Sequence, residues 1–254
     1  MSISLEICVD SVESAIAAEK GGADRIELCS GLHVGGLTPE QELIESVRSN
    51  VLLEVSVMIR PRDGDFVYGP HEIEAMMREI ESARASGADG VVLGTLHQDG
   101  EVNIEALRRL IDQAWPMQVT FHRAFDISPN PRHSLEQVIA AGASRILTSG
   151  GAADAVTGVA GLARLVRTAE GRIAIMAGGG VRSENVRELV RTSEVREIHT
   201  SLRTTNRSHS GSTLQGGNGV QYSHSREHFA VNAADVLVLR QILDAIESSG
   251  ISPE

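Results

Sequence analysis

The sequence of 254 residues is long enough for one closed barrel of eight βα units, which needs roughly 250 residues, or for two small domains. With 41% hydrophobic and 22% charged residues, it has the composition of a folded globular protein and not of a disordered chain. A formal net charge of −11 disfavours binding to nucleic acid or to an anionic membrane surface, so small molecules or metal ions are the expected partners.

The N-terminal residues, MSISLE, lack the basic segment and the apolar run of a secretory signal. No apolar stretch reaches the roughly 18 residues that a membrane span needs. We therefore expect a cytoplasmic protein with no membrane partner. Its two cysteines, Cys8 and Cys29, are too few for the disulfide framework of a small secreted fold, so both are expected to be free thiols.

Short β-like runs alternate with helical patterns eight times along the chain, with short connections. The predicted strands cover residues 3–9, 25–29, 51–59, 90–93, 117–122, 145–148, 172–177 and 195–199. The predicted helices cover residues 12–20, 39–49, 72–85, 104–114, 134–141, 161–169, 183–190 and 234–246. Eight even units predict an α/β fold of the closed (β/α)8 barrel type, as a single domain over 1–254. An open doubly wound sheet would show a similar alternation.

The segment 204–230 departs from this rhythm, because it is rich in Ser, Thr, Asn, Gly and His and has no apolar periodicity. It is typical of a long loop after the eighth strand, either a surface insertion or a lid over the site. The spacing of His209, His224 and His228 matches no pattern of metal ligands, so no metal role is assigned to them.

Alternation along the predicted strands separates a helix-facing side from a lumen-facing side. In the first strand every second residue from Ile3 to Val9 is apolar, so Glu6 and Cys8 face the lumen. The same reasoning directs a set of polar residues and one methionine inward in other strands: Arg25, Glu27, Cys29, Glu54, Ser56, Met58, Arg60, Thr120, His122, Glu197 and His199.

So many ionisable groups in one lumen need an explanation, since buried charges are costly unless they are paired. One explanation is an ion-pair network that fills space, in which Glu6, Glu27 and Glu54 balance Arg25, Arg60 and Arg123. The other is a functional site, because barrel enzymes place their chemistry at the C-terminal ends of the strands.

The two cysteines occupy equivalent places in adjacent strands, each two residues after a glutamate, in the motifs EIC and ELC. Both are expected near the site mouth. Two thiolates without further cysteines favour Cu(I) among the soft metals, because a closed zinc site takes four ligands. Met58 could add a thioether. The alternative is that Cys8 and Cys29 are small buried hydrophobic residues.

The segment VTFHRAFD ends the fifth strand with a histidine, an arginine and an aspartate close together. His122 is a candidate general acid or base, with Glu27, Arg123 and Asp126 as further candidate catalytic residues. Arg60 is a candidate ligand for an anionic substrate. A histidine at a strand end can equally be a hydrogen-bonded packing residue.

The run of Gly178, Gly179 and Gly180 leaves the seventh strand toward a helix. Backbone amides in such a loop can bind an anion, and phosphate sites in barrels often follow strands seven and eight. Glycine-rich turns are also common connectors. The remaining candidate anion-binding residues are Ser149, His199 and Ser201.

In order along the chain, EICVDSVESAIAAEKGGADRIELCSGLHVGGLTPE, VMIRPRDGDFVY, VTFHRAFD, RILTSGG, IMAGGGVRSENV and EIHTS resemble the CutC family from Leu5 to about Ser201. The resemblance implies a (β/α)8 barrel, a role in copper homeostasis, and Cu(I) binding through the cysteines that correspond to Cys8 and Cys29. From Arg203 onward the sequence departs from the family pattern.

Two functions stay open at this point. The first is a copper-handling protein centred on the cysteine pair, with copper as its ligand. The second is a barrel enzyme, of lyase or isomerase type, that acts on a small anionic or phosphorylated metabolite. In either case, barrels of this kind commonly form homo-oligomers, as dimers or tetramers.

Overall fold

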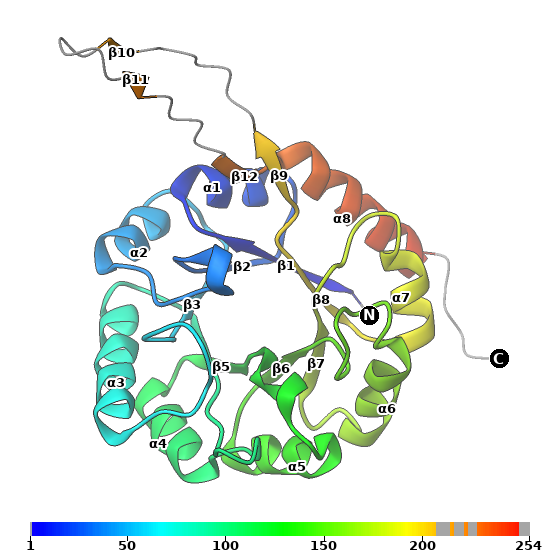
Figure 1. The fold of residues 1–254 in the computed structure, drawn as a ribbon. Coiled ribbons are helices and arrows are strands. Elements are labelled where there is room, and N and C mark those ends of the chain that lie inside the picture. The colour runs from blue at the N-terminus through cyan, green and yellow to red at the C-terminus, as the bar shows by residue number, and fades with distance from the viewer. Residues whose placement is uncertain (1, 207–213, 216–220, 223–227, 249–254) are drawn as a thin grey trace.

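A computed structural model describes residues 2–206, 214–215, 221–222 and 228–248, with side chains for 2–202 and 230–248. Eight parallel strands form a closed barrel in which each strand pairs with the next along the chain, and β8 returns to pair with β1. The helices surround this barrel (Figure 1). The predicted (β/α)8 fold is confirmed.

The barrel strands are short and largely buried. They are β1 (Ser4–Val9), β2 (Arg25–Leu28), β3 (Glu54–Met58), β4 (Gly90–Leu93), β5 (Gln118–Phe121), β6 (Arg145–Thr148), β7 (Ala174–Ala177) and β8 (Glu197–Thr200). The helices are α1 (Val12–Lys20), α2 (Gln41–Arg48), α3 (Pro70–Ala85), α4 (Ile104–Ala114), α5 (Pro131–Ala141), α6 (Val159–Ala169), α7 (Val186–Ser193) and α8 (Ala233–Ser248). Two 3-10 helices, η1 (Leu32–Val34) and η2 (Arg123–Ile127), follow β2 and β5.

The helix-facing parity predicted from the sequence forms one large apolar core between strands and helices. Two helices begin earlier than their apolar periodicity indicated, because Pro70 and Pro131 occupy their first positions, where the missing N–H costs nothing. β3 and β7 are shorter at their starts than predicted, at residues 54 and 174. The apolar residues just before these two strands continue the apolar alternation, but they do not take part in the hydrogen bonds between strands.

The lumen contains a buried layer of alternating charges. Arg25 bonds the carboxylates of Glu6 and Glu197, and Arg145 also pairs with Glu197. This network differs from the expected one. Glu54 lies exposed at the start of β3, and neither Arg60 nor Arg123 pairs with one of the predicted glutamates.

The segment predicted as a long loop contains short antiparallel pairings of backbone. β9 (Arg203–Asn206) pairs with β12 (His228–Val231), and β10 (Leu214–Gln215) pairs with β11 (Gln221–Tyr222). β12 approaches α1, where the Val231 amide donates to the hydroxyl of Ser14 at 3.4 Å. His209 and His224 lie outside the described residues, and so does the side chain of His228.

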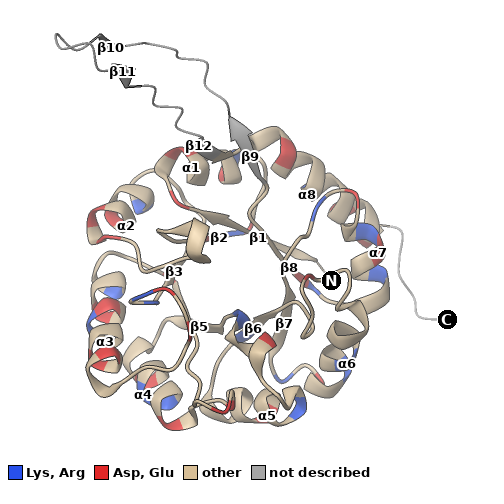
Figure 2. Ribbon diagram, viewed as in Figure 1, with Lys and Arg blue, Asp and Glu red and all other residues tan. Residues whose placement is uncertain are grey.

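Charged side chains are spread over the outer helices (Figure 2). None of the described helices is long and apolar enough to cross a membrane.

Candidate functional site

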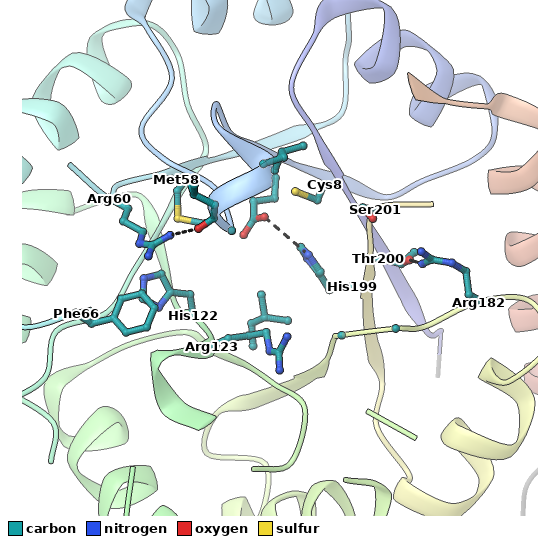
Figure 3. Close-up of a pocket in the computed structure, with 17 residues that line it drawn as sticks. Cys8, Met58, Arg60, Phe66, His122, Arg123, Arg182, His199, Thr200 and Ser201 are labelled. Carbon is teal, nitrogen blue, oxygen red and sulfur yellow. Dashed lines mark hydrogen bonds and ion pairs between the residues drawn. The ribbon is translucent and has the colours of Figure 1, made fainter. Parts of the chain in front are cut away.

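A cavity of about 390 Å³ opens at the C-terminal ends of the barrel strands (Figure 3). Ten residues singled out from the sequence line it: Cys8, Glu27, Met58, Arg60, His122, Arg123, Gly179, Gly180, His199 and Ser201. Four others singled out do not line it: Cys29, Asp126, Ser149 and Gly178. Arg60, Phe66 and His122 lie on one side of the cavity, and Cys8 and His199 lie on the other.

The two thiols meet at the edge of this cavity, where Cys8 lines it and Cys29 is fully buried behind it. The sulfurs of Cys8 and Cys29 are 3.8 Å apart, and both residues are buried in a small cluster with Met58 and Val92. Hydrogen bonds from Cys29 and from His199 outweigh burial and lower the pKa of the Cys8 thiol to about 5. The same contact with Cys8, together with burial, raises the pKa of Cys29. Cys8 is therefore the thiolate of the pair at neutral pH.

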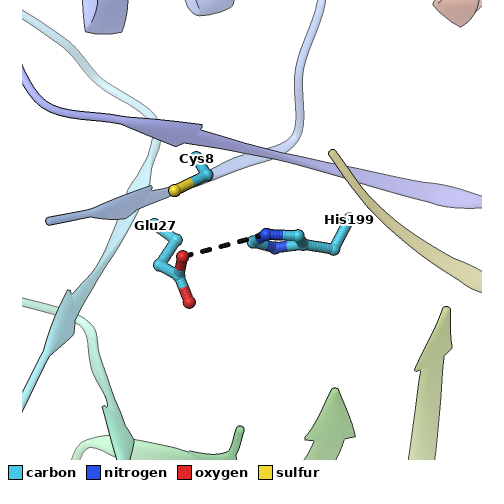
Figure 4. Close-up of side chains that lie close together, drawn as sticks. All are labelled: Cys8, Glu27 and His199. Atoms are coloured by element: carbon cyan, nitrogen blue, oxygen red, sulfur yellow. Dashed lines mark ion pairs between the residues drawn. The ribbon is translucent and has the colours of Figure 1, made fainter. Parts of the chain in front are cut away.

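His199 lies between Glu6 and Glu27, and Figure 4 shows its position beside Glu27 and Cys8. Its Nδ1 is 2.7 Å from a carboxylate oxygen of Glu6, and its Nε2 is 3.8 Å from one of Glu27. Burial opposes the charged form of His199, but Glu27, Cys8 and Glu6 outweigh it and raise the histidine pKa well above its usual value. Burial would also raise the pKa of Glu6, yet His199 and Arg25 lower it to about 2.

Glu27 is the unsatisfied member of this group. Burial, followed by the negative charge of Cys8, raises its pKa well above the usual value. Its Oε1 is buried and has no hydrogen-bond partner among the described residues. One ligand atom each from Cys8, Glu27 and His199 lies within 4.8 Å of the others, so these three residues could hold a metal ion.

By sequence alone these three residues have different expected roles: Cys8 as a metal ligand, Glu27 as a catalytic residue and His199 as an anion ligand. Strand register brings them together: Cys8 is the partner of Glu27 across β1 and β2, and Glu6 is the partner of His199 across β1 and β8. Inward parity identified every member. The closed barrel was predicted, but the sequence does not give the register that sets Cys8 beside Glu27 and Glu6 beside His199.

His122 occupies a different environment from His199. It is buried, and its ring centroid is 4.7 Å from that of Phe66. The guanidinium of Arg60 lies over the Phe66 ring, 4.9 Å from its centroid. Burial and the charge of Arg60 lower the pKa of His122 to about 3, so it is neutral at physiological pH. A neutral imidazole can donate a hydrogen bond, and the role of His122 in acid–base catalysis stays a prediction.

Arg123 and Asp126 organise the loop after β6. Arg123 donates to Asp126 at 2.8 Å, and Asp126 accepts from the backbone amides of Ser149 and Gly151 and from the hydroxyl of Thr148. Ser149 is fully buried, and its hydroxyl is 2.9 Å from Asp126. The aspartate is saturated by these contacts and lies behind the cavity wall, whereas Arg123 reaches the cavity itself.

The glycine run divides in the same way. Gly179 and Gly180 line the cavity with left-handed backbone, at φ 99° and 73°. Gly178 packs behind them, where a Cβ would lie 2.5 Å from the side chain of Leu147. Among the described residues the amides of Gly179 and Gly180 have no acceptor. Ser201 lines the cavity just after β8.

The chain was compared with known proteins. The model of the CutC family matches residues 3–204. A human copper homeostasis protein cutC homolog is 47% identical over 201 residues, which cover 79% of this chain and 74% of the relative. A CutC family protein from Chromobacterium violaceum is 44% identical over 244 residues, covering 94% of this chain and 98% of the relative.

Solved structures agree with the family match. The crystal structure of a CutC protein from Streptococcus agalactiae superposes with a TM-score of 0.75 at 32% identity, covering 78% of this chain and 98% of that one. A thiamine phosphate pyrophosphorylase from Pyrococcus furiosus, at 17% identity and a TM-score of 0.59 over 96% of both chains, shares the fold alone. The resemblance predicted from the sequence motifs is confirmed, and the chain belongs to the CutC family.

Proposed function

We propose that this protein binds Cu(I) through the sulfurs of Cys8 and Cys29 at the mouth of the barrel, and that it takes part in copper homeostasis. The observation that carries the proposal is the approach of two buried thiols to 3.8 Å beside the cavity. A metal–thiolate bond is roughly 2.3 Å long in zinc sites, so two sulfurs less than twice that distance apart can bond one ion. Soft thiolates favour Cu(I) among the biological metals.

The surroundings of the thiol pair support a metal site. The Cys8 thiol can lose its proton at neutral pH without a separate general base, because its pKa is already lowered to about 5. Glu6 holds the Nδ1 side of His199, which leaves Nε2 toward Glu27. This is the carboxylate–histidine arrangement that orients metal ligands in proteins. An ion bound there would displace the Nε2 proton and could use the unpartnered oxygen of Glu27.

Zinc is the competing metal, because Cys8, Cys29, Glu27 and His199 together offer the four donors of a closed zinc site. The family name favours copper: the human and mouse relatives are both named copper homeostasis protein cutC homolog. Met58, buried in the same cluster, offers a thioether that suits Cu(I) and not Zn²⁺.

The test is an anaerobic titration of Cu(I) against a competing chelator, with a parallel titration of Zn²⁺. We expect the double variant Cys8→Ser with Cys29→Ser to lose Cu(I) affinity by on the order of 100-fold or more. Met58→Leu should weaken Cu(I) binding and leave Zn²⁺ binding unchanged. Met77→Leu removes a thioether on α3, outside the cavity wall, and serves as the matched control.

Unchanged Cu(I) affinity in the double variant would refute the proposal. A lower dissociation constant for Zn²⁺ than for Cu(I), each obtained by competition with its chelator, would replace copper by zinc as the metal of this site.

A further inference from the structure

Arg60 is a buried cation for which the described residues supply no counterion. The residue is 5% exposed, and no described carboxylate lies within 4.0 Å of its guanidinium. Arg25 and Arg145, the other two buried arginines among the described residues, both pair with glutamates. A buried charge without a partner is costly, so its persistence indicates that something else neutralises it.

Backbone carbonyls fix Arg60 in place without neutralising it. Its Nη1 donates to the carbonyls of Val34 and Gly36 at 2.9 and 3.1 Å, and its Nη2 donates to that of Gly64 at 2.8 Å. Its Nε is buried and has no partner among the described residues. The guanidinium is therefore held rigidly at the cavity wall while retaining its full charge and an unused N–H.

His122 adds a neutral donor beside this cation. Its Nδ1 accepts a hydrogen bond from the Ala124 amide at 3.2 Å, so the neutral ring carries its proton on Nε2. That Nε2 is buried and unpartnered among the described residues. The ring of Phe66 contacts both the imidazole and the guanidinium of Arg60. Two orphaned donors on one wall of a cavity are unusual, because buried polar groups are nearly always hydrogen-bonded.

The rest of the cavity wall is also suited to an anion. Arg123 and Arg182 contribute two more guanidiniums, and Arg182 forms no ion pair with the described part of the chain. The amides of Gly179 and Gly180 are free of acceptors there as well. Glu27 is the one acidic residue among the described residues that line the cavity, and it lies beside the two thiols.

We propose that Arg60 and His122 bind the oxyanion of a small molecule, a carboxylate or phosphate group, on the side of the cavity across from Cys8 and His199. This site goes beyond the proposed copper function and shares no residue with it. A cavity of about 390 Å³ limits the ligand to a metabolite of modest size. The protein would then hold a small organic anion and a metal ion in one cavity, each on its own wall.

The test is calorimetric titration of the full chain with inorganic phosphate and, separately, with malonate. We expect at least one of these anions to bind, and Arg60→Gln and His122→Phe each to weaken it by about tenfold or more. His122→Phe keeps an aromatic ring against Phe66 while it removes the Nε2 donor, together with the Nδ1 acceptor of the Ala124 amide, so it decides the question if Arg60→Gln fails to fold. Binding of phosphate alone or of malonate alone would identify the class of ligand.

Arg62→Gln is the matched control, because it removes the same charge only two residues from Arg60. Arg62 is half-exposed and already pairs with Asp65 and Glu72. We expect that variant, and the double variant of Cys8 and Cys29, to bind the anion within about twofold of the wild type. The proposal is overturned if neither anion binds, or if Arg60→Gln and Arg62→Gln weaken binding equally. Because the cysteine variant keeps this wall intact, failure of the copper proposal leaves the anion result unaffected.

Discussion

His122 and His199 line the same cavity, yet their environments push their pKa values in opposite directions. Glu6 and Glu27 surround His199, whereas burial and Arg60 act on His122. The difference matters for function, because a cationic imidazole repels a metal until it loses its proton. A neutral one can donate a hydrogen bond at any physiological pH.

The lowered pKa of His122 predicts a loss of stability in mild acid. The unfolded chain takes up this proton near pH 6.5 and the folded chain only near pH 3. Between these values the unfolded state binds more protons, so the free energy of unfolding falls as the pH falls. From pH 7 to pH 5 the loss is about 2 kcal/mol, at 1.36 kcal/mol per pH unit once the unfolded histidine titrates.

Urea unfolding of wild type and His122→Gln at pH 7, 6 and 5 gives the free energy of unfolding of each protein as a function of pH. The effect of His122 is the difference between the two slopes. His199 and the carboxylates are common to both proteins and cancel. His133→Gln, at an exposed position on α5, is the control and should follow the wild type. Parallel pH dependence in wild type and His122→Gln would contradict the assignment of a buried neutral imidazole.

Arg25 tests the buried charge layer in the lumen. Arg25→Met removes one of the partners of Glu6 and one partner of Glu197, and the carboxylates stay buried. We expect a loss of roughly 3–5 kcal/mol in the free energy of unfolding, measured by urea titration at pH 7. Arg172→Met removes a two-pronged but exposed pair with Glu136 and should cost about 1 kcal/mol or less. Equal losses in both variants would mean that burial adds nothing to the pairing.

At the scale of elements, α6 depends on glycine where it meets the loop after β6. A Cβ on Gly161 would lie 2.1 Å from the carbonyl oxygen of Gly150, a backbone atom that cannot turn aside. Gly161→Ala should therefore destabilise the protein by about 1–3 kcal/mol, seen as a lower urea midpoint. Gly69→Ala, at the start of α3 where a Cβ meets only the tip of Glu72 at 3.7 Å, should change stability by about 0.5 kcal/mol or less. A neutral Gly161→Ala would show that α6 is free to shift on this loop.

The elements also show what the sequence could predict. Period and parity gave the eight βα units and the inward direction of Cys8, Glu27, Arg60 and His199, because both depend only on local alternation. The partners of Arg60 could not be predicted in this way. They are carbonyls around η1 and Gly64, and loop backbone carries no periodic signal. The antiparallel pairing of β9 with β12 was missed for the same reason.

The pKa values of the site were equally beyond the sequence, since they depend on three-dimensional neighbours. His122 was a candidate acid or base because an isolated histidine titrates near neutrality. Its burial and the nearby charge of Arg60, which lower the pKa of the imidazole, come from the fold and not from the local sequence. Asp126 was a candidate catalytic residue because it follows a strand, and its contacts with Ser149 and Gly151 instead direct it into the loop.

At the scale of the whole molecule, the proposed metal site lies across the closure of the barrel. Cys8 belongs to β1 and Glu27 to β2, whereas His199 comes from β8, which completes the barrel by pairing with β1. An ion that bonds Cys8 and His199 would join the two ends of the fold. Binding at such a position requires the closed barrel, because the unfolded chain separates these residues by most of its length.

Cu(I) should therefore raise the global stability of the protein. At a free Cu(I) concentration about a hundred times the dissociation constant, the free energy of unfolding should increase by up to about 2.7 kcal/mol, less any binding of Cu(I) to the two thiols in the unfolded chain. Anaerobic urea unfolding in a Cu(I)-buffered solution measures this shift. The double variant of Cys8 and Cys29 should show none, and His199→Gln should show a reduced one, because it keeps both thiols and loses the ligand from β8. A full shift in His199→Gln would confine the ion to the thiol pair and remove β8 from the site, and a full shift in the double variant would place copper elsewhere on the protein.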